Sequence, residues 1–159
     1  MALFLSTFEN KVDKKGRVSV PASFRTAVAS SHFQGIAVYR HLSLPCVEGA
    51  DISFLEQLSD QLYEDFGPFD TDQLSVATSI LAESSQLAFD SEGRILLPAA
   101  MREFMGIDGF ATFVGLGRKF QIWAPDAFAE HRAAQRDIAA DKITELPPFG
   151  KRGQTGGRT

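Results

Sequence analysis

The chain has 159 residues, 44% of them hydrophobic and fourteen of them Phe, with a net charge of −4 and a single cysteine. That size and apolar content suit one domain, or two small domains fused tightly around a real core. The lone Cys46 excludes an internal disulfide and indicates a reducing compartment. No run approaches the roughly 18 apolar residues of a spanning helix, and residues 1–12 make a poor signal peptide, so we expect a soluble cytoplasmic protein.

Positive charge is concentrated near the start of the chain. Residues 1–47 carry six Lys or Arg against two acids, whereas residues 48–83 carry nine acids and no Lys or Arg. Because a charged partner responds to the local field and not to the total, the basic end can bind a polyanion while the acidic end faces away. Ordinary solvated surfaces also produce such runs, so charge alone leaves both interpretations open.

A thirteen-residue motif occurs twice without a gap. Residues 13–25 read DKKGRVSVPASFR and residues 90–102 read DSEGRILLPAAMR, with six identical positions. We expect what both copies keep to serve the shared fold, and what differs to mark specialisation of one copy. The identical pairs are Asp13 and Asp90, Gly16 and Gly93, Arg17 and Arg94, Pro21 and Pro98, Ala22 and Ala99, and Arg25 and Arg102.

Each motif predicts a strand, a turn, a second strand and then a short helix. In 8–20 and in 87–97, Asp begins and Gly ends a tight turn between apolar-alternating segments. Proline then ends the second strand and opens a helix, which places Phe24 and Met101 facing inward. Further strands are expected at 36–39, 111–114 and 120–123.

The rest of the chain predicts helices and a tail. Apolar residues at 3-4-4 spacing over 55–66 indicate one amphipathic helix. Gly67-Pro68 ends it, and Asp70 or Thr71 can cap a second helix that reaches residue 81. An Ala-rich third helix is expected from Pro125 to about residue 143. A flexible Pro- and Gly-rich tail follows and carries Lys151, Arg152 and Arg158.

These elements indicate an α+β fold, mainly β, in which two repeats share one core. Each repeat alone buries too little apolar surface to be stable, so we expect the two to pack around a pseudo-twofold axis. The expected divisions are repeat 1 at 7–54, a helical connector at 55–82, repeat 2 at 83–126, a C-terminal helix at 127–143 and a flexible tail at 144–159.

The paired motifs resemble the MraZ family of bacterial transcriptional regulators, which are built from two SpoVT-AbrB-type domains. The resemblance runs from about Thr7 to His131, and the sequence FQIW at 120–123 also fits the family pattern. It implies swapped-hairpin β-barrels, one pseudo-dimer per chain, assembled into homo-oligomeric rings. It further implies a repressor in the cytoplasm, associated with the nucleoid, that binds repeated operator sites in double-stranded DNA ahead of the division and cell-wall gene cluster.

Two interpretations stay open for Arg17 and Arg25. Pairing with Asp13 or with helix carbonyls is consistent with their retention as Arg94 and Arg102. Contact with phosphates or guanine edges would use the forked geometry of the guanidinium. We favour DNA contact in the first copy only.

Lys14 and Lys15 have no structural reason to be lysine, because the second copy replaces them with Ser91 and Glu92. Phosphate contact is the favoured explanation. The expected DNA-binding residues are Lys11, Lys14, Lys15, Arg17 and Arg25. The expected structural residues are Asp13, Gly16, Pro21, Asp90, Gly93, Arg94, Pro98 and Arg102.

Catalysis and metal binding are not expected. Cys46 and the three histidines, His32, His41 and His131, show no metal-ligand spacing, and the second copy has no equivalent of the His41–Cys46 pair. There is no glycine-rich phosphate loop and no nucleophile elbow, so we expect no enzyme, no metal and no cofactor. The alternative function is a non-specific nucleoid-associated DNA-binding protein, or an assembly protein that docks through the acidic connector.

Overall fold

The computed structural model describes residues 2–150, which divide after Pro125 into two compact units. The first unit holds a six-stranded antiparallel sheet, in the order β1-β7-β8-β4-β3-β5, and a two-stranded ribbon formed by β2 and β6. The α+β class expected from the sequence is confirmed. The strands are β1 (Thr7–Lys11), β2 (Arg17–Ser19), β3 (Gly35–Arg40), β4 (Val47–Ala50), β5 (Ser85–Ala88), β6 (Arg94–Leu96), β7 (Phe110–Gly115) and β8 (Phe120–Trp123).

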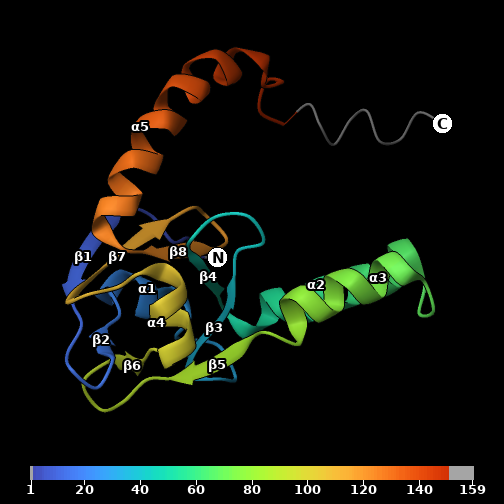
Figure 1. Cartoon of the computed structure of the whole chain (residues 1–159). Coiled ribbons are helices and arrows are strands. Elements are labelled where there is room, and N and C mark those ends of the chain that lie inside the picture. Colours follow the sequence, from blue (N-terminus) through green and yellow to red (C-terminus); the bar gives the residue numbers. More distant parts are fainter. Residues whose placement is uncertain (1, 151–159) are drawn as a thin grey trace. The chain divides into compact units, whose positions relative to one another are not determined.

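The helices begin and end close to where the sequence signals place them. Gly67 ends the first connector helix, and the Asp70 carboxylate caps the second by accepting from the backbone N–H groups of Asp72 and Gln73 at 2.7 and 3.3 Å. Figure 1 shows the connector helices extending away from the strands. No helix within residues 2–150 is long and apolar enough to cross a membrane. The helices are α1 (Ala22–Ala27), α2 (Ile52–Phe66), α3 (Thr71–Val76) with its π-helical continuation η1 (Ala77–Leu81), α4 (Ala99–Met105), α5 (Pro125–Lys142) and the 3-10 turn η2 (Ile143–Glu145).

The two repeats exchange strands. β1 of the first repeat pairs with β7 of the second, β5 of the second pairs with β3 of the first, and β4 and β8 meet at the centre of the sheet. The outermost strands, β1 and β5, are not neighbours, so the described strands form an open sheet and not the closed barrels that the family resemblance implies. The exchange agrees with the expected pseudo-twofold arrangement, because each repeat completes the sheet of the other.

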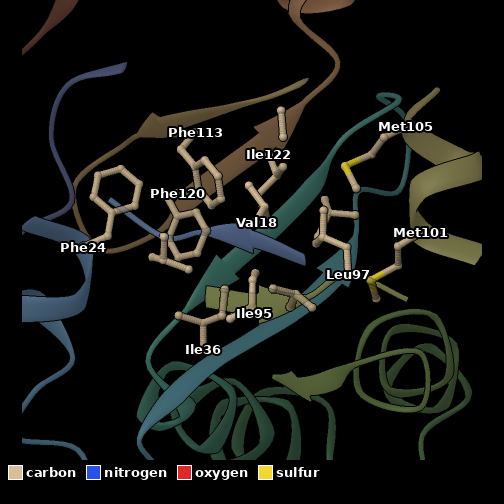
Figure 2. Close-up of a cluster of buried hydrophobic side chains, with 14 of the residues drawn as sticks. Val18, Phe24, Ile36, Ile95, Leu97, Met101, Met105, Phe113, Phe120 and Ile122 are labelled. Carbon is tan, nitrogen blue, oxygen red and sulfur yellow. The ribbon is translucent and has the colours of Figure 1, made fainter. Parts of the chain in front are cut away.

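One core serves both repeats. Figure 2 shows Phe24 from α1 beside Phe113 and Phe120 from β7 and β8, with Met101 and Met105 approaching from α4. The Phe24 ring centroid lies 5.2 Å from that of Phe120, and its side chain is fully buried. Phe24 and Met101 therefore face inward as expected. Further buried members of this core come from both copies of the motif and from the sheet, and they include Val18, Val20, Ile36, Val38, Val47, Ile95, Leu97 and Ile122.

α5 begins at Pro125, which confirms the helix expected there, and its residues from Asp126 onward open the second unit. None of its side chains is buried, and Lys142 in its last turn pairs with Glu145 at 3.4 Å. The basic residues Lys151, Arg152 and Arg158 of the expected tail lie outside the described residues.

Candidate nucleic-acid interface

The two Asp-x-x-Gly turns have the same construction. The Asp13 Oδ1 atom accepts from the backbone N–H groups of Lys15 and Arg17 at 3.0 and 2.9 Å. Asp90 Oδ1 accepts from the corresponding groups two and four residues on, both at 2.9 Å. The glycine of each turn has a positive φ, +93° at Gly16 and +77° at Gly93, a conformation that other residues rarely adopt. The structure thus places both aspartates and both glycines as turn formers.

Each turn also fixes an arginine. Arg17 Nε donates to Asp13 Oδ2 at 2.7 Å, and Arg94 Nε donates to Asp90 Oδ2 at 2.8 Å. The backbone N–H of the arginine is the largest cause that holds the pKa of each aspartate below its usual range, and the arginine side chain also lowers it. Because each ion pair uses Nε, the outer edge of the guanidinium has donors left for a further acceptor.

The two turns differ in charge. In the second copy, Glu92 adds a carboxylate at 3.2 Å from Arg94 Nη2, so two acids surround one arginine. In the first copy, exposed Lys14 and Lys15 stand beside Arg17 against a single acid. Residues 13–17 therefore carry a net +2 and residues 90–94 a net −1. A polyanion is attracted to the first turn and repelled by the second.

The β2–β6 ribbon carries these turns and exposes one face. In its register Arg17 is opposite Leu96, Val18 is opposite Ile95, and Ser19 is opposite Arg94. Val18 and Ile95 are each 1% exposed and point into the core, so the residues on either side of them in each strand point outward. The outer face thus consists of Arg17, Ser19, Arg94 and Leu96, with Leu96 56% exposed.

Leu96 was not expected at the site from sequence. The signal for it was present, because the apolar alternation of the second copy places a leucine where the first copy has the polar Ser19.

Lys11 lies at the end of β1, close to this ribbon in sequence and exposed. Its neighbour Asn10 donates from Nδ2 to the Ser19 carbonyl at 2.7 Å, which ties β1 to β2. Lys11, Lys14, Lys15 and Arg17 thus all belong to the segment that enters the ribbon, and we call these four residues the basic turn.

Arg25 is separated from the basic turn. It is half-buried at the end of α1, and its Nη1 donates to the Val20 carbonyl at 2.6 Å. Its guanidinium lies against Gly93 of the second repeat, so close that a Cβ at Gly93 would lie 2.7 Å from Arg25 Cζ. Arg102 occupies the equivalent place against Gly16 of the first repeat. The geometry supports the structural interpretation of Arg25 more than the DNA-contact one.

A second polar arrangement lies in the sheet and was not expected from sequence. The Glu48 carboxylate, 7% exposed, accepts from Tyr39 Oη at 2.9 Å, Gln121 Nε2 at 2.9 Å and Lys119 Nζ at 3.1 Å. Burial raises the pKa of Glu48, but the bonds from these three side chains outweigh it and leave the pKa below its ordinary value. Trp123 Nε1 extends the network by donating to Gln121 Oε1 at 2.9 Å. This network joins β3, β4 and β8.

Neither Cys46 nor His41 has the surroundings of a reactive group. Cys46 is buried, and burial together with the nearby Glu48 carboxylate raises its pKa to about 12. His41 Nδ1 accepts from the backbone N–H groups of Ser43 and Leu44, both at 3.0 Å, and so closes a turn. Within residues 2–150 no three His, Cys, Asp or Glu side chains lie close enough to hold a metal ion.

The sequence of this chain is similar to those of known proteins of one family. A family described as "MraZ protein, putative antitoxin-like" matches residues 80–145. A protein of Rickettsia bellii named transcriptional regulator MraZ is 40% identical over 147 residues, which is 92% of this chain and 97% of that protein. Proteins of the same name from Rickettsia canadensis and Rickettsia rickettsii are 39% and 40% identical over 146 residues, with the same two shares covered. The chain belongs to the MraZ family of transcriptional regulators.

Proposed function

We propose that this transcriptional regulator is a sequence-specific repressor that binds double-stranded DNA through the outer face of the β2–β6 ribbon. The observation that carries the proposal is the basic turn at one end of that exposed ribbon, where residues 13–17, Asp13 included, have a net charge of +2. A two-stranded ribbon fits the major groove, where base edges are distinguishable. Lys11, Lys14 and Lys15 supply charge for phosphates, and Arg17 supplies the forked donor that guanine recognition uses.

Binding by a single basic turn would be weak at physiological salt, because a few phosphate contacts supply little affinity. We therefore include in the proposal a ring-like homo-oligomer that presents the turn repeatedly to repeated operator sites. Simultaneous contacts raise the overall affinity when their spacing matches that of the repeats. The proposed target is the regulator's own division and cell-wall gene cluster, bound at the nucleoid in the cytoplasm.

The test is a mobility-shift titration on the DNA upstream of the protein's own gene, with a scrambled duplex of equal length as the control. We expect binding to the upstream DNA at least tenfold tighter than to the scrambled duplex. Equal affinity for both would reject the specific repressor and favour a non-specific nucleoid-associated protein. Light scattering on the same sample reports the assembly, and a monomeric mass would reject the ring.

A further inference from the structure

We infer that Arg102, a residue of the second repeat, is the positioning residue for the basic turn of the first repeat, and that Arg25 does the same for the acidic turn of the second. The inference rests on the proposed function, because it assigns the DNA-binding turn a support from the other half of the chain. Arg25 and Arg102 then act on DNA binding through the turns they hold and not by touching DNA.

Arg102, Leu97 and Gly16 form a closed set of contacts. The Leu97 N–H donates to the Gly16 carbonyl at 2.9 Å, and Arg102 Nε donates to the Leu97 carbonyl at 3.1 Å. The guanidinium then lies against Gly16 itself, since a Cβ placed there would be 2.7 Å from Arg102 Nε and 2.8 Å from its Cζ. Arg102 thus binds the strand that holds the turn and covers the glycine within the turn.

Arg25, Val20 and Gly93 repeat this set with the repeats exchanged. The Val20 N–H donates to the Gly93 carbonyl at 3.1 Å, and Arg25 Nη1 donates to the Val20 carbonyl at 2.6 Å. A Cβ at Gly93 would lie 2.7 Å from three atoms of the Arg25 guanidinium. Both arginines are half-buried, and both are kept in the two copies of the motif.

The turns need this support because the ribbon is short. β2 and β6 have three residues each, so their ladder alone does little to fix the turns at its two ends. A turn that is free to move must be ordered when it binds, and that ordering reduces affinity. Loss of Arg102 would free the turn with net charge +2, whereas loss of Arg25 would free the turn with net charge −1. The loss of Arg102 and the loss of Arg25 should therefore affect the fold equally but reduce DNA affinity unequally.

The experiment compares Arg102→Ala with Arg25→Ala in the full chain. We expect similar losses of thermal stability but unequal losses of operator affinity, about tenfold for Arg102→Ala and less than about threefold for Arg25→Ala. The salt dependence of binding should keep its slope in both, because neither arginine neutralises a phosphate. Removal of an arginine that did bind phosphate would instead lower the slope by about 0.9 for each phosphate that it neutralised. Equal affinity losses, or a lowered slope, would overturn the inference.

Amide hydrogen exchange tests the positioning without DNA and so separates this inference from the proposed function. Arg102→Ala should speed exchange of the Lys15 and Arg17 N–H groups, which donate to Asp13, and leave residues 90–94 unchanged. Arg25→Ala should do the reverse. If Arg102→Ala does not fold, Arg102→Lys serves instead, since a lysine keeps the charge but not the planar group that covers Gly16. Exchange that speeds equally at both turns, or at neither, would disprove the positioning role.

Discussion

Exchanging the charges of the two turns tests most directly which end of the ribbon meets DNA. The variant Lys14→Ser with Lys15→Glu gives the first turn the residues of the second, and changes its net charge from +2 to −1. Both lysines are exposed and the Asp13 bonds use backbone and Arg17 groups, so the fold should be unaffected. The matched variant Ser91→Lys with Glu92→Lys makes the converse change at the second turn.

The magnitude follows from counterion release. Two lysines that each neutralise one phosphate contribute about 1.8 to the slope of log K against log salt for each turn bound. Between 50 and 200 mM salt, that slope corresponds to about a twelvefold extra loss of affinity, which the first variant should no longer show. Fluorescence anisotropy on operator DNA at four or five salt concentrations measures this slope for the natural chain and for the variant.

Three outcomes would contradict the assignment to the first turn. An unchanged slope in the Lys14→Ser, Lys15→Glu variant would show that these lysines do not meet phosphates. A large gain of affinity in the Ser91→Lys, Glu92→Lys variant would show that the second turn also faces DNA. Loss of binding in a fully folded Arg94→Ala variant would refute the asymmetry between the copies.

The remaining predictions concern stability and reactivity. Glu48→Ala should lower the free energy of unfolding by about 3 kcal/mol in urea titrations, because it leaves buried donors unpaired; a loss below about 1 kcal/mol would show that the network is not stabilising. The folded-state pKa of Glu48 lies below its ordinary 4.5, so its contribution is present above that pH and is lost as the pH falls through the lowered value; Glu48→Gln should accordingly flatten the acid limb of stability. Phe24→Ala should cost about 3–5 kcal/mol by the same measurement, through the cavity it leaves. Cys46, with its pKa raised to about 12 by burial, should resist iodoacetamide in the native protein and react only on unfolding.

The repeated motif made most of the fold predictable. Its turn residues, its prolines and the inward positions of Phe24 and Met101 are local signals, and each copy supports the other. Gly67 and Asp70 likewise mark helix boundaries through backbone conformation and capping, which depend on neighbouring residues alone. Features of this kind are visible without knowledge of the tertiary structure.

The strand β4 was not among the strands expected from the sequence, and its residues show why. Val47-Glu48-Gly49-Ala50 contains two residue types that are depleted in strands. Glu48 is tolerated there because three side chains from β3, β8 and the loop before β8 bond to its carboxylate. Gly49 is tolerated because Phe120 lies over it, so near that a Cβ would be 2.5 Å from the ring. Both reasons are tertiary contacts, which no local pattern predicts.

The candidate site was predicted only in part, because some of its features are local in sequence and others depend on tertiary contacts. The charge difference between the two turns can be counted along the chain, and it led to Lys14 and Lys15. The contact of Arg25 with Gly93 cannot be predicted from the sequence, because the two residues are distant along the chain and meet only through the exchange of strands. Arg25 was therefore expected to contact DNA, although its retention as Arg102 in the second copy is consistent with a structural role.

The exchange of strands also fixes when the protein can fold during synthesis. Thr7 pairs with Val114, and Arg17 pairs with Leu96. The strands β1 and β2 are therefore synthesised long before their partners β7 and β6. Pairings between such distant residues are slow to form, because the intervening chain must be closed into a loop first. During synthesis β2 therefore has no partner strand until β6 has been made, and β1 has none until β7 has been made. The contacts that Leu97 and Arg102 make with Gly16 likewise form only after the second half of the chain has been made.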